Sequence, residues 1–456
     1  MSQHLFKDFD DVSANAWKQK IQMDLKGKDY NSLITKTAEN IAIKPFYHQE
    51  DLSQKTAAQS YNDWLIVQEF DLDSEHLNHD LILQSVDKGT QKIVLKLKSS
   101  LSDNQWQTLK KLADKNVDVL LEVYTGNKTF NEIVAQVKSL KNLKLVNDPI
   151  HFLVLKGYYP EHSKTTEDII KTQVSHQNRL LINASLYHNA GANATQEIAY
   201  TAAHLNEYLN LLADKKQLTA LKEIKCKVAV GSRYFIEIAK LQALRILLES
   251  LLSKYEIKPF IRIQSINAHR NKTIYDYNLN MIRSTAESMA GILGGAEEIN
   301  NLPYDFLFHH PNDFGQRIAR NQLLMLREES HLDKVKNPTE GSYLFNSITH
   351  QLAEASLELL KSIEKSGGFL KQLKEGKIQQ KIKEKAQQEQ AKFDDKEMTL
   401  VGLNKYVDEN GHVKDQLDFY PFVTPRHEKT QIEPIIAKRL AEATEKEWLE
   451  GENQKS

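Results

Sequence analysis

A tyrosine and a histidine follow an apolar run in LINASLYHNAGANATQEIAY, residues 181–200. In a barrel of alternating strands and helices, side chains at the carboxyl ends of the strands carry the chemistry. In such a position, His188 could donate a hydrogen bond to a substrate carbonyl group, with Tyr187 beside it. Alternatively, His188 satisfies a buried carbonyl group of its own loop, and the spacing alone favours this second interpretation.

An arginine stands at the start of a predicted helix in GSRYFIEIAKLQALR, residues 231–245. Arg233 could hold an anion there, because the N-terminus of a helix also attracts negative charge. Alternatively, apolar residues such as Phe235 and Leu241 pack this helix on a barrel, while Arg233 pairs with a nearby acid. The pattern favours this structural interpretation.

Residues 321–354 combine many charged side chains with a Gly-Ser-Tyr sequence after a proline, which raises the question of an active site. Glu328 and Glu329 are adjacent, so on a helix they point to different sides and are poor partners for acid–base work. Glu329 and His331 together are too few for a metal site. We expect an ion pair between Arg327 and Glu328 to fix the helix, and we interpret the segment as mostly structural.

Composition excludes several classes of protein. The chain has 456 residues, a formal net charge of -1 and 27% charged residues, so it has no global basic field that would attract nucleic acid. No apolar run approaches the length of a membrane span, and the N-terminus lacks the apolar region of a signal peptide. The single cysteine, Cys226, excludes an internal disulfide framework. We therefore expect a cytoplasmic protein without membrane or nucleic-acid partners.

Short apolar runs begin at Trp64 and alternate with stretches of helical spacing. The runs are WLIVQEF, LILQ, KIVLKL, VDVLLEV, LKLV, HFLVL, RLLINAS, KVAV and FIRIQS. Runs that are apolar on both faces are typical of buried parallel strands. About eight strand–helix repeats predict an α/β fold, a (β/α)8 TIM-type barrel, with an open doubly wound sheet as the alternative. Strands are expected to stop after about residue 275, where long helical patterns begin.

Three regions follow from this pattern. Residues 1–60 are polar and contain one short amphipathic helix, so we predict an N-terminal arm that packs on something else. Residues 61–335 form the predicted barrel. Residues 336–456 form a helical C-terminal extension, whose charged helix near 371–397 is interpreted as solvated.

Several motifs in order resemble the methylmalonyl-CoA mutase family. The most specific is RIARNQLLMLREESHLDKVKNPTEGSYLFNSIT, residues 317–349, which is slightly altered and one residue shorter than the family pattern. Others are WKQKIQMDLKGKDYNSLITKTAENIAIKPFY, YHNAGANATQEIAY, AGILGGAEEI and VGLNKY. Together they extend from Trp17 to about Pro434. The resemblance implies a (β/α)8 barrel related to enzymes that interconvert succinyl-CoA and methylmalonyl-CoA with adenosylcobalamin.

The chain departs from the catalytic pattern of that family in two places. No histidine lies in the Asp-x-His-x-x-Gly motif of the cobalt ligand, which implies no flavodoxin-like cobalamin-binding domain. IKPFYHQEDLSQK stands where catalytic members carry a substrate-contacting run that ends in Arg-Gln-Tyr-Ala-Gly. His188 matches the position of the family's substrate-carbonyl histidine, but its neighbours Asn189 and Ala190 differ.

This combination resembles the small (beta) subunit of heterodimeric members. The resemblance implies a degenerate, non-catalytic barrel in which His188 is vestigial and no cofactor or metal is bound. It implies a large (alpha) subunit as partner, which carries adenosylcobalamin. Two alternatives stay open: a catalytic barrel served by a separate cobalamin-binding chain, and a stand-alone CoA-thioester-binding protein that uses Tyr187 and Arg233.

Overall fold

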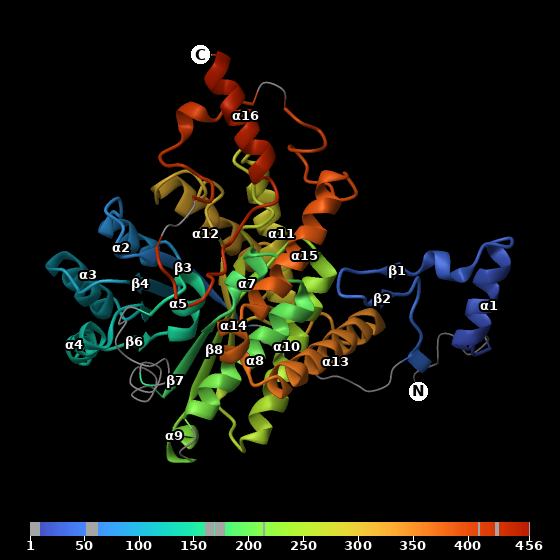
Figure 1. The fold of residues 1–456 in the computed structure, drawn as a ribbon, viewed down its shortest axis with the longest axis horizontal. Helices are drawn as coiled ribbons and strands as arrows, with labels where there is room; N and C mark the ends of the chain where they lie inside the picture. The colour runs from blue at the N-terminus through green and yellow to red at the C-terminus, as the bar shows by residue number, and fades with distance from the viewer. Residues whose placement is uncertain are drawn as a thin grey trace.

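The computed structural model describes residues 10–51, 63–159, 168, 178–212, 215–408, 411–424 and 428–455. At its centre lies an eight-stranded, nearly closed parallel barrel surrounded by helices (Figure 1). The strands are β3 (Leu65–Asp71), β4 (Lys92–Leu97), β5 (Asp118–Val123), β6 (Leu143–Val146), β7 (Arg179–Asn183), β8 (Glu223–Val230), β9 (Phe260–Asn267) and β10 (Glu298–Asn300). The predicted (β/α)8 TIM-type class is confirmed.

The strand order is β6-β5-β4-β3-β10-β9-β8-β7, so β3 and β10 pair in the middle of the sheet. Within the described residues, no backbone ladder joins β6 to β7. We call this unpaired edge the seam. The strands β3–β6 form the first half of the barrel and β7–β10 the second.

Helices cover the outside of the barrel. They are α2 (His79–Asp87), α3 (Asp103–Asp114), α4 (Asn127–Val137), α5 (Pro149–Lys156), α7 (Ser185–Asn189), α8 (Ala194–Leu211), α9 (Lys215–Thr219), α10 (Tyr234–Lys254), α11 (Leu279–Leu293) and α12 (Asp313–Glu328). Asn193 and Gln196 form a capping box that begins α8. Within the part of the chain that the structure describes, no helix has both the length and the apolar character needed to cross a membrane.

In the described part of the chain, four α-helices follow the barrel: α13 (Tyr343–Lys365), α14 (Phe369–Lys374), α15 (Lys377–Asp394) and α16 (Glu442–Lys455), with the 3-10 helix η3 (Lys414–Gln416) before the last of them. The buried face of α13 includes Ile348 and Leu352, which belong to the same apolar cluster as α8 and α10. Helix α13 therefore packs directly on the helices of the barrel. The boundary at 335 between barrel and extension stays a prediction, and the boundary at 60 lies outside the described residues.

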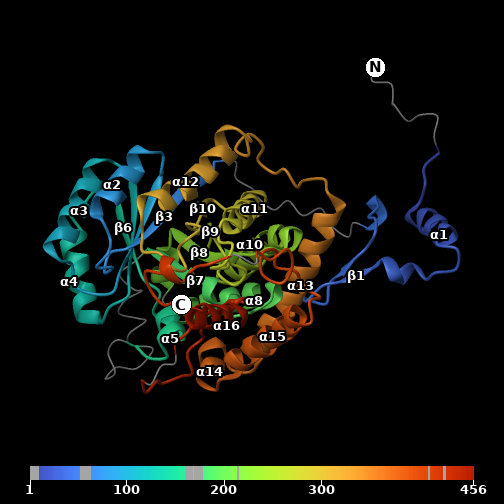
Figure 2. The same ribbon diagram turned by 90° about the horizontal axis from the view of Figure 1, so that it is seen from above.

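The N-terminal arm extends away from the barrel, with α1 on the side opposite α2–α4 (Figure 2). It contains α1 (Ala14–Asp24), the 3-10 helices η1 (Tyr30–Leu33) and η2 (Gln49–Asp51), and the hairpin β1 (Thr35–Lys36) with β2 (Ala42–Ile43). Trp17 of α1 stacks on Phe46 at 4.8 Å between ring centroids. None of the residues of α1 is buried.

Three element predictions were wrong. LILQ lies in α2 and HFLVL in α5, because short apolar runs suit a helix as well as a strand. Asp148 caps α5 and Pro149 occupies its first turn, which are strong signals for a helix start. Strands do not stop near residue 275, because the three-residue β10 follows α11 and closes the ladder between β9 and β3.

Candidate functional site

The barrel mouth, where the carboxyl ends of the strands meet, contains a cavity of about 550 Å³. His188 and Arg233 both line it, together with residues of the β1–β2 hairpin and of α15. The structure therefore brings together two of the three residues that the sequence singled out. The third, Tyr187, is not among the lining residues of this cavity.

Arg233 is engaged by a carboxylate of the chain's own arm. Its Nη1 lies 2.6 Å from Oε1 of Glu39, which stands between β1 and β2. The same oxygen accepts a hydrogen bond of 3.2 Å from the backbone N–H of Ala194, at the start of α8. Burial alone would raise the pKa of Glu39, but the charge of Arg233 and this N–H outweigh it and hold the pKa below its usual value. The anion that Arg233 binds is therefore the Glu39 carboxylate of the same chain.

His188 faces a buried chain of charges. Its Nδ1 lies 3.4 Å from Oε2 of Glu197. Glu197 also accepts from Lys240 at 2.7 Å and from the backbone N–H of Ala229 at 3.1 Å, and Lys240 pairs with Glu237 at 2.5 Å. The neighbour of His188 is therefore a carboxylate whose charge Lys240 already compensates.

Tyr187 points into the protein interior. Its hydroxyl group lies 3.1 Å from Nδ1 of His204, whose Nε2 lies 3.0 Å from Asp148. Asp148 also accepts from the Tyr208 hydroxyl group at 2.6 Å. Burial, with the nearby charge of Asp148, raises the pKa of Tyr187 well above its ordinary value. The Tyr187 hydroxyl group is thus used in a buried network that holds α7 to α8.

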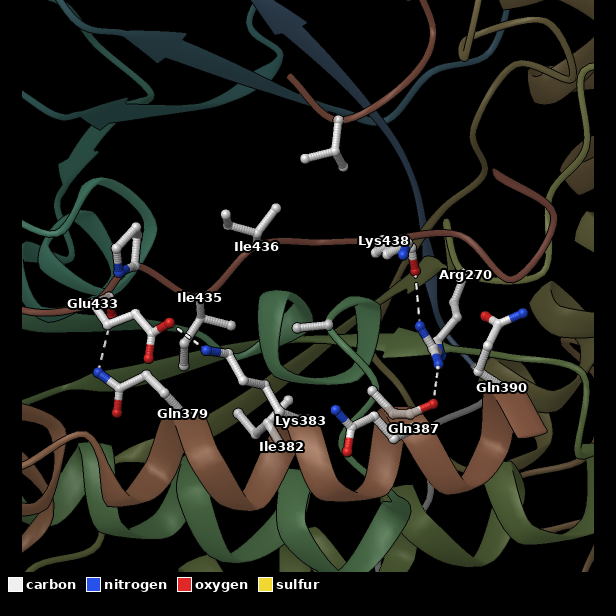
Figure 3. Close-up of a pocket in the computed structure, with 14 residues that line it drawn as sticks. Arg270, Gln379, Ile382, Lys383, Gln387, Gln390, Glu433, Ile435, Ile436 and Lys438 are labelled. Atoms are coloured by element: carbon white, nitrogen blue, oxygen red, sulfur yellow. Dashed lines mark hydrogen bonds and ion pairs between the residues drawn. The ribbon is translucent and has the colours of Figure 1, made fainter. Parts of the chain in front are cut away.

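An extended segment crosses the mouth above α15, and we call residues 431–440 the strap (Figure 3). Backbone N–H groups of the strap donate to Val154 at 2.8 Å, to Asn189 at 3.0 Å and to Arg270 at 2.9 Å. The guanidinium group of Arg270 donates to the carbonyl group of Lys438 at 2.8 Å and pairs with Glu389 of α15. The strap and α15 therefore cover the mouth and are fastened to it through Arg270.

The barrel axis is filled by side chains. One layer is apolar and contains Val67, Val94, Leu120, Val146 and Leu181. Toward the mouth, Lys227 of β8 reaches across the axis to Glu69 of β3 and Glu122 of β5, each at 2.7 Å. Toward the opposite end, Lys92 and Lys225 pair with Glu298 at 2.7 and 2.8 Å.

These charges are buried and depend on one another. The side chains of Lys227 and Lys225 are 1% and 2% exposed, and that of Glu298 is fully buried. Burial raises the pKa of Glu298, but Lys225 and Lys92 outweigh it and lower the pKa to about 2. Since the filled layers have almost no accessible surface, an elongated ligand could lie along the axis only by displacing these ion pairs.

Residues 321–354 include the end of α12 and the start of α13, and their contacts are structural. Arg327 lies over the ring of Trp64, 4.3 Å from its centroid. Among the ion pairs of the described residues, none joins Arg327 to Glu328, so that predicted pair is wrong. Gln242 of α10 bonds to Thr339 at 2.7 Å and to Thr349 at 3.0 Å. In the part of the chain that is described, no cluster of His, Cys, Asp and Glu could hold a metal ion.

The sequence did not identify the residues that form ion pairs and hydrogen bonds with the predicted site residues or fill the barrel axis. Glu39, Glu197, Lys227 and Asp148 were not singled out. Asp148 before Pro149 carried a recognisable helix-start signal. The other three had none, because each meets its partner only after distant elements come together.

Fold and site define a (β/α)8-type barrel whose axis is filled by its own side chains and whose mouth is covered by the chain's own strap and α15. The profile of methylmalonyl-CoA mutase matches residues 103–450. The chain belongs to the methylmalonyl-CoA mutase family.

The relatives of this chain include one that is named as a small subunit and others that are named without reference to a subunit. The methylmalonyl-CoA mutase small subunit of Porphyromonas gingivalis is 30% identical, over 83% of this chain and 67% of that protein. The methylmalonyl-CoA mutase of Cereibacter sphaeroides is 26% identical, over 86% of this chain and 64% of that protein. The mitochondrial methylmalonyl-CoA mutase of Mus musculus is 26% identical, over 95% of this chain and 68% of that protein. The chain thus spans about two thirds of the length of these relatives.

Proposed function

We propose that this chain is the non-catalytic small subunit of a heterodimeric methylmalonyl-CoA mutase. Its role is to stabilise a large subunit that interconverts succinyl-CoA and methylmalonyl-CoA. The observation that carries the proposal is the filled axis, in which Lys227 ties Glu69 to Glu122. The resemblance implies that catalytic members of the family thread CoA through the barrel, and here that path is taken by buried ion pairs. Displacing one partner of a buried ion pair costs several kcal/mol, about 3–5, so this chain would not open the path for a substrate.

The residues of this mouth do not fit adenosylcobalamin. The strap and α15 lie over the mouth, and Arg270 joins them through Lys438 and Glu389. The imidazole of His188 faces Glu197 on one side. On the other side it lies close to the backbone of Gly231, since a Cβ atom placed on Gly231 would be only 2.9 Å from Nε2 of His188. We therefore assign the cofactor to the large subunit.

The arm is the best candidate for the contact with that subunit. Val12, Trp17 and Met23 are 57%, 46% and 75% exposed, although all are large and apolar. A helix of 11 residues with no buried residue is marginally stable in water by itself. A partner that covers the exposed side chains of Trp17 and Met23 would stabilise α1. We expect assembly in the cytoplasm, where the buried thiol of Cys226 stays reduced.

The test combines mass and activity. The purified chain is mixed with its large subunit and adenosylcobalamin, complex mass is measured by light scattering, and succinyl-CoA conversion is assayed with wild type and His188→Ala. We expect a one-to-one complex whose turnover is unchanged by the substitution. No complex, or a collapse of turnover with His188→Ala, would overturn the proposal.

A stand-alone CoA-thioester-binding protein is the second candidate. The cavity of about 550 Å³ beside His188 favours it. The occupation of Arg233 by Glu39 opposes it. Calorimetry with succinyl-CoA on the isolated chain separates the two, because the subunit proposal predicts no heat of binding and the second candidate predicts saturable binding.

A further inference from the structure

Helix α11 buries polar side chains and exposes apolar ones. Its buried residues include the polar residues Asn280, Ser284, Glu287 and Ser288. On the outside, Ile282 is 69% exposed, and Ala286 four residues further on is exposed as well. A surface helix of a globular protein normally has the opposite arrangement, with its charged and polar groups in water. The arrangement of α11 therefore indicates that another element covers its outer face.

The two charged residues of α11 are both engaged within the chain. Glu287 is 2% exposed and pairs with Lys272 at 2.6 Å. Nη2 of Arg283 donates to the carbonyl group of Val401 at 2.6 Å. A partner with charged groups would thus find no complementary charge on the outer face of this helix, and polar groups buried without a partner are costly. The surface that covers α11 should therefore be apolar.

The outward residues of α11 repeat at the spacing of helix-to-helix packing. They follow steps of three and four residues, as the a and d positions of a coiled coil do: Leu279, Ile282, Ala286, Met289 and Leu293. We call these five residues the apolar stripe. Its middle residue is the small Ala286, which permits close approach of a second helix. The spacing points to an α-helix as the element that covers the apolar stripe.

The apolar stripe begins beside an apolar hollow. A cavity of about 370 Å³ lies between α11 and the segment that follows α15. Leu279 and Ile282 line it from the helix, and Met398 and Val401 line it from the segment. A bulky apolar side chain of a partner would fill this hollow, as anchor residues do at the centre of protein interfaces.

The hollow adjoins the region that the N-terminal arm reaches. Four residues line both the hollow and the mouth cavity that the β1–β2 hairpin borders: Ser232, Asn271, Met398 and Leu440. The arm and the segment that follows α15 lie on the side of the barrel away from α2–α4 (Figure 1). One partner on this side of the molecule can therefore contact the exposed side chains of α1 and the apolar stripe together.

We propose that the apolar stripe and the adjoining hollow are the docking surface for an apolar α-helix of the large subunit. This inference rests on the proposed function, because that function supplies the partner. The helix lays its apolar residues along Ile282 and Ala286 and places a bulky side chain in the hollow. The contact is separate from the arm, so it attaches the partner to the body of the barrel.

Affinity for the large subunit tests the docking surface. The Kd is measured by calorimetry for the wild type, for Ile282→Lys and for the control Leu357→Lys. Ile282→Lys puts a charge on the apolar stripe, and its desolvation should weaken binding by about tenfold or more. Leu357 is 36% exposed on α13, so its variant makes the same exchange elsewhere on the surface and should change Kd less than about twofold. Ala286→Arg should weaken binding as Ile282→Lys does, so the result does not depend on how one variant folds.

The possible failures can be told apart. If the wild type binds and both stripe variants bind as tightly as the control, the docking surface is wrong and the subunit role stands. If the wild type forms no complex, the proposed function is wrong and this inference fails with it. If the isolated chain forms a dimer in light scattering that Ile282→Lys abolishes, a second copy of the chain covers the stripe and the assignment to the large subunit is wrong.

Hydrogen exchange of the wild-type chain gives a check without any substitution. In the complex, peptides covering 279–293 should exchange more slowly by about tenfold, because a covering helix suppresses local opening of α11. Peptides covering 103–114, in α3 on the other side of the barrel, should keep their rate. Unchanged exchange of 279–293 in a complex that has formed would overturn the docking surface.

Discussion

Oε1 of Glu39 lies 2.6 Å from Nη1 of Arg233, and this ion pair fastens the N-terminal arm to the barrel mouth. The arginine that could have held a ligand anion instead holds the arm. The pair thus connects the two features of the chain that matter most for its proposed role: the arm with its exposed apolar side chains, and the covered mouth of the barrel.

Glu39→Gln should loosen the arm. The substitution leaves the charge of Arg233 without its partner, and because the Arg233 side chain is 31% exposed, we expect a moderate loss of about 1–3 kcal/mol in the free energy of unfolding. Urea denaturation measures it. Glu50→Gln, which alters a more exposed carboxylate of the same arm, is the control with an expected change below about 0.5 kcal/mol. Equal effects of the two substitutions would contradict the fastening role.

Lys227→Met should destabilise the barrel strongly. It leaves Glu122 and Glu69 facing each other across the axis, although Lys96 still pairs with Glu69 at 2.7 Å. We expect a loss of about 3–5 kcal/mol, measured by urea denaturation. Adding Glu122→Gln should recover part of this loss, since it removes one uncompensated charge. A double variant no more stable than Lys227→Met would mean that the charges do not interact.

Acid should weaken the axis network through Glu298. Its pKa of about 2 in the folded protein lies below the unfolded value near 4.5. A depressed pKa contributes stability that is present above pH 4.5 and is lost as the pH falls toward 2, here about 3 kcal/mol. Thermal unfolding between pH 2 and 7 should show this decline. Glu298→Gln should have a shallower pH dependence over the same window, and an identical slope would refute the assignment.

Cys226 should be unreactive in the folded protein. Burial raises the pKa of its thiol to about 12, and the side chain is fully buried on β8. A thiol reagent at pH 8 should therefore label the native chain only at the rate of its unfolding, and label the denatured chain fully. Rapid labelling under native conditions would show that the outer face of β8, which the helices cover, is accessible.

Much of the architecture was predictable from local patterns. The apolar runs of β3–β5 and β7–β9 have the composition of buried parallel strands, and they defined the (β/α)8 class. The amphipathic spacing around Trp17 predicted α1. Errors arose where an apolar run was too short to distinguish the periodicity of a helix from that of a strand, as in α5. They also arose where a strand had only three residues, as in β10.

The sequence by itself determined the fold class, the family resemblance and the identity of the residues at the strand ends. Only the tertiary structure decided what those residues do. Glu39 meets Arg233, Lys227 meets Glu122 across 105 residues of chain, and Asp148 bonds Asn183 at the seam. Local propensity acts over a few neighbours, whereas a buried charge takes its partner from whichever element the fold places beside it. Whether the barrel holds a ligand or its own ion pairs is therefore settled by packing across the axis.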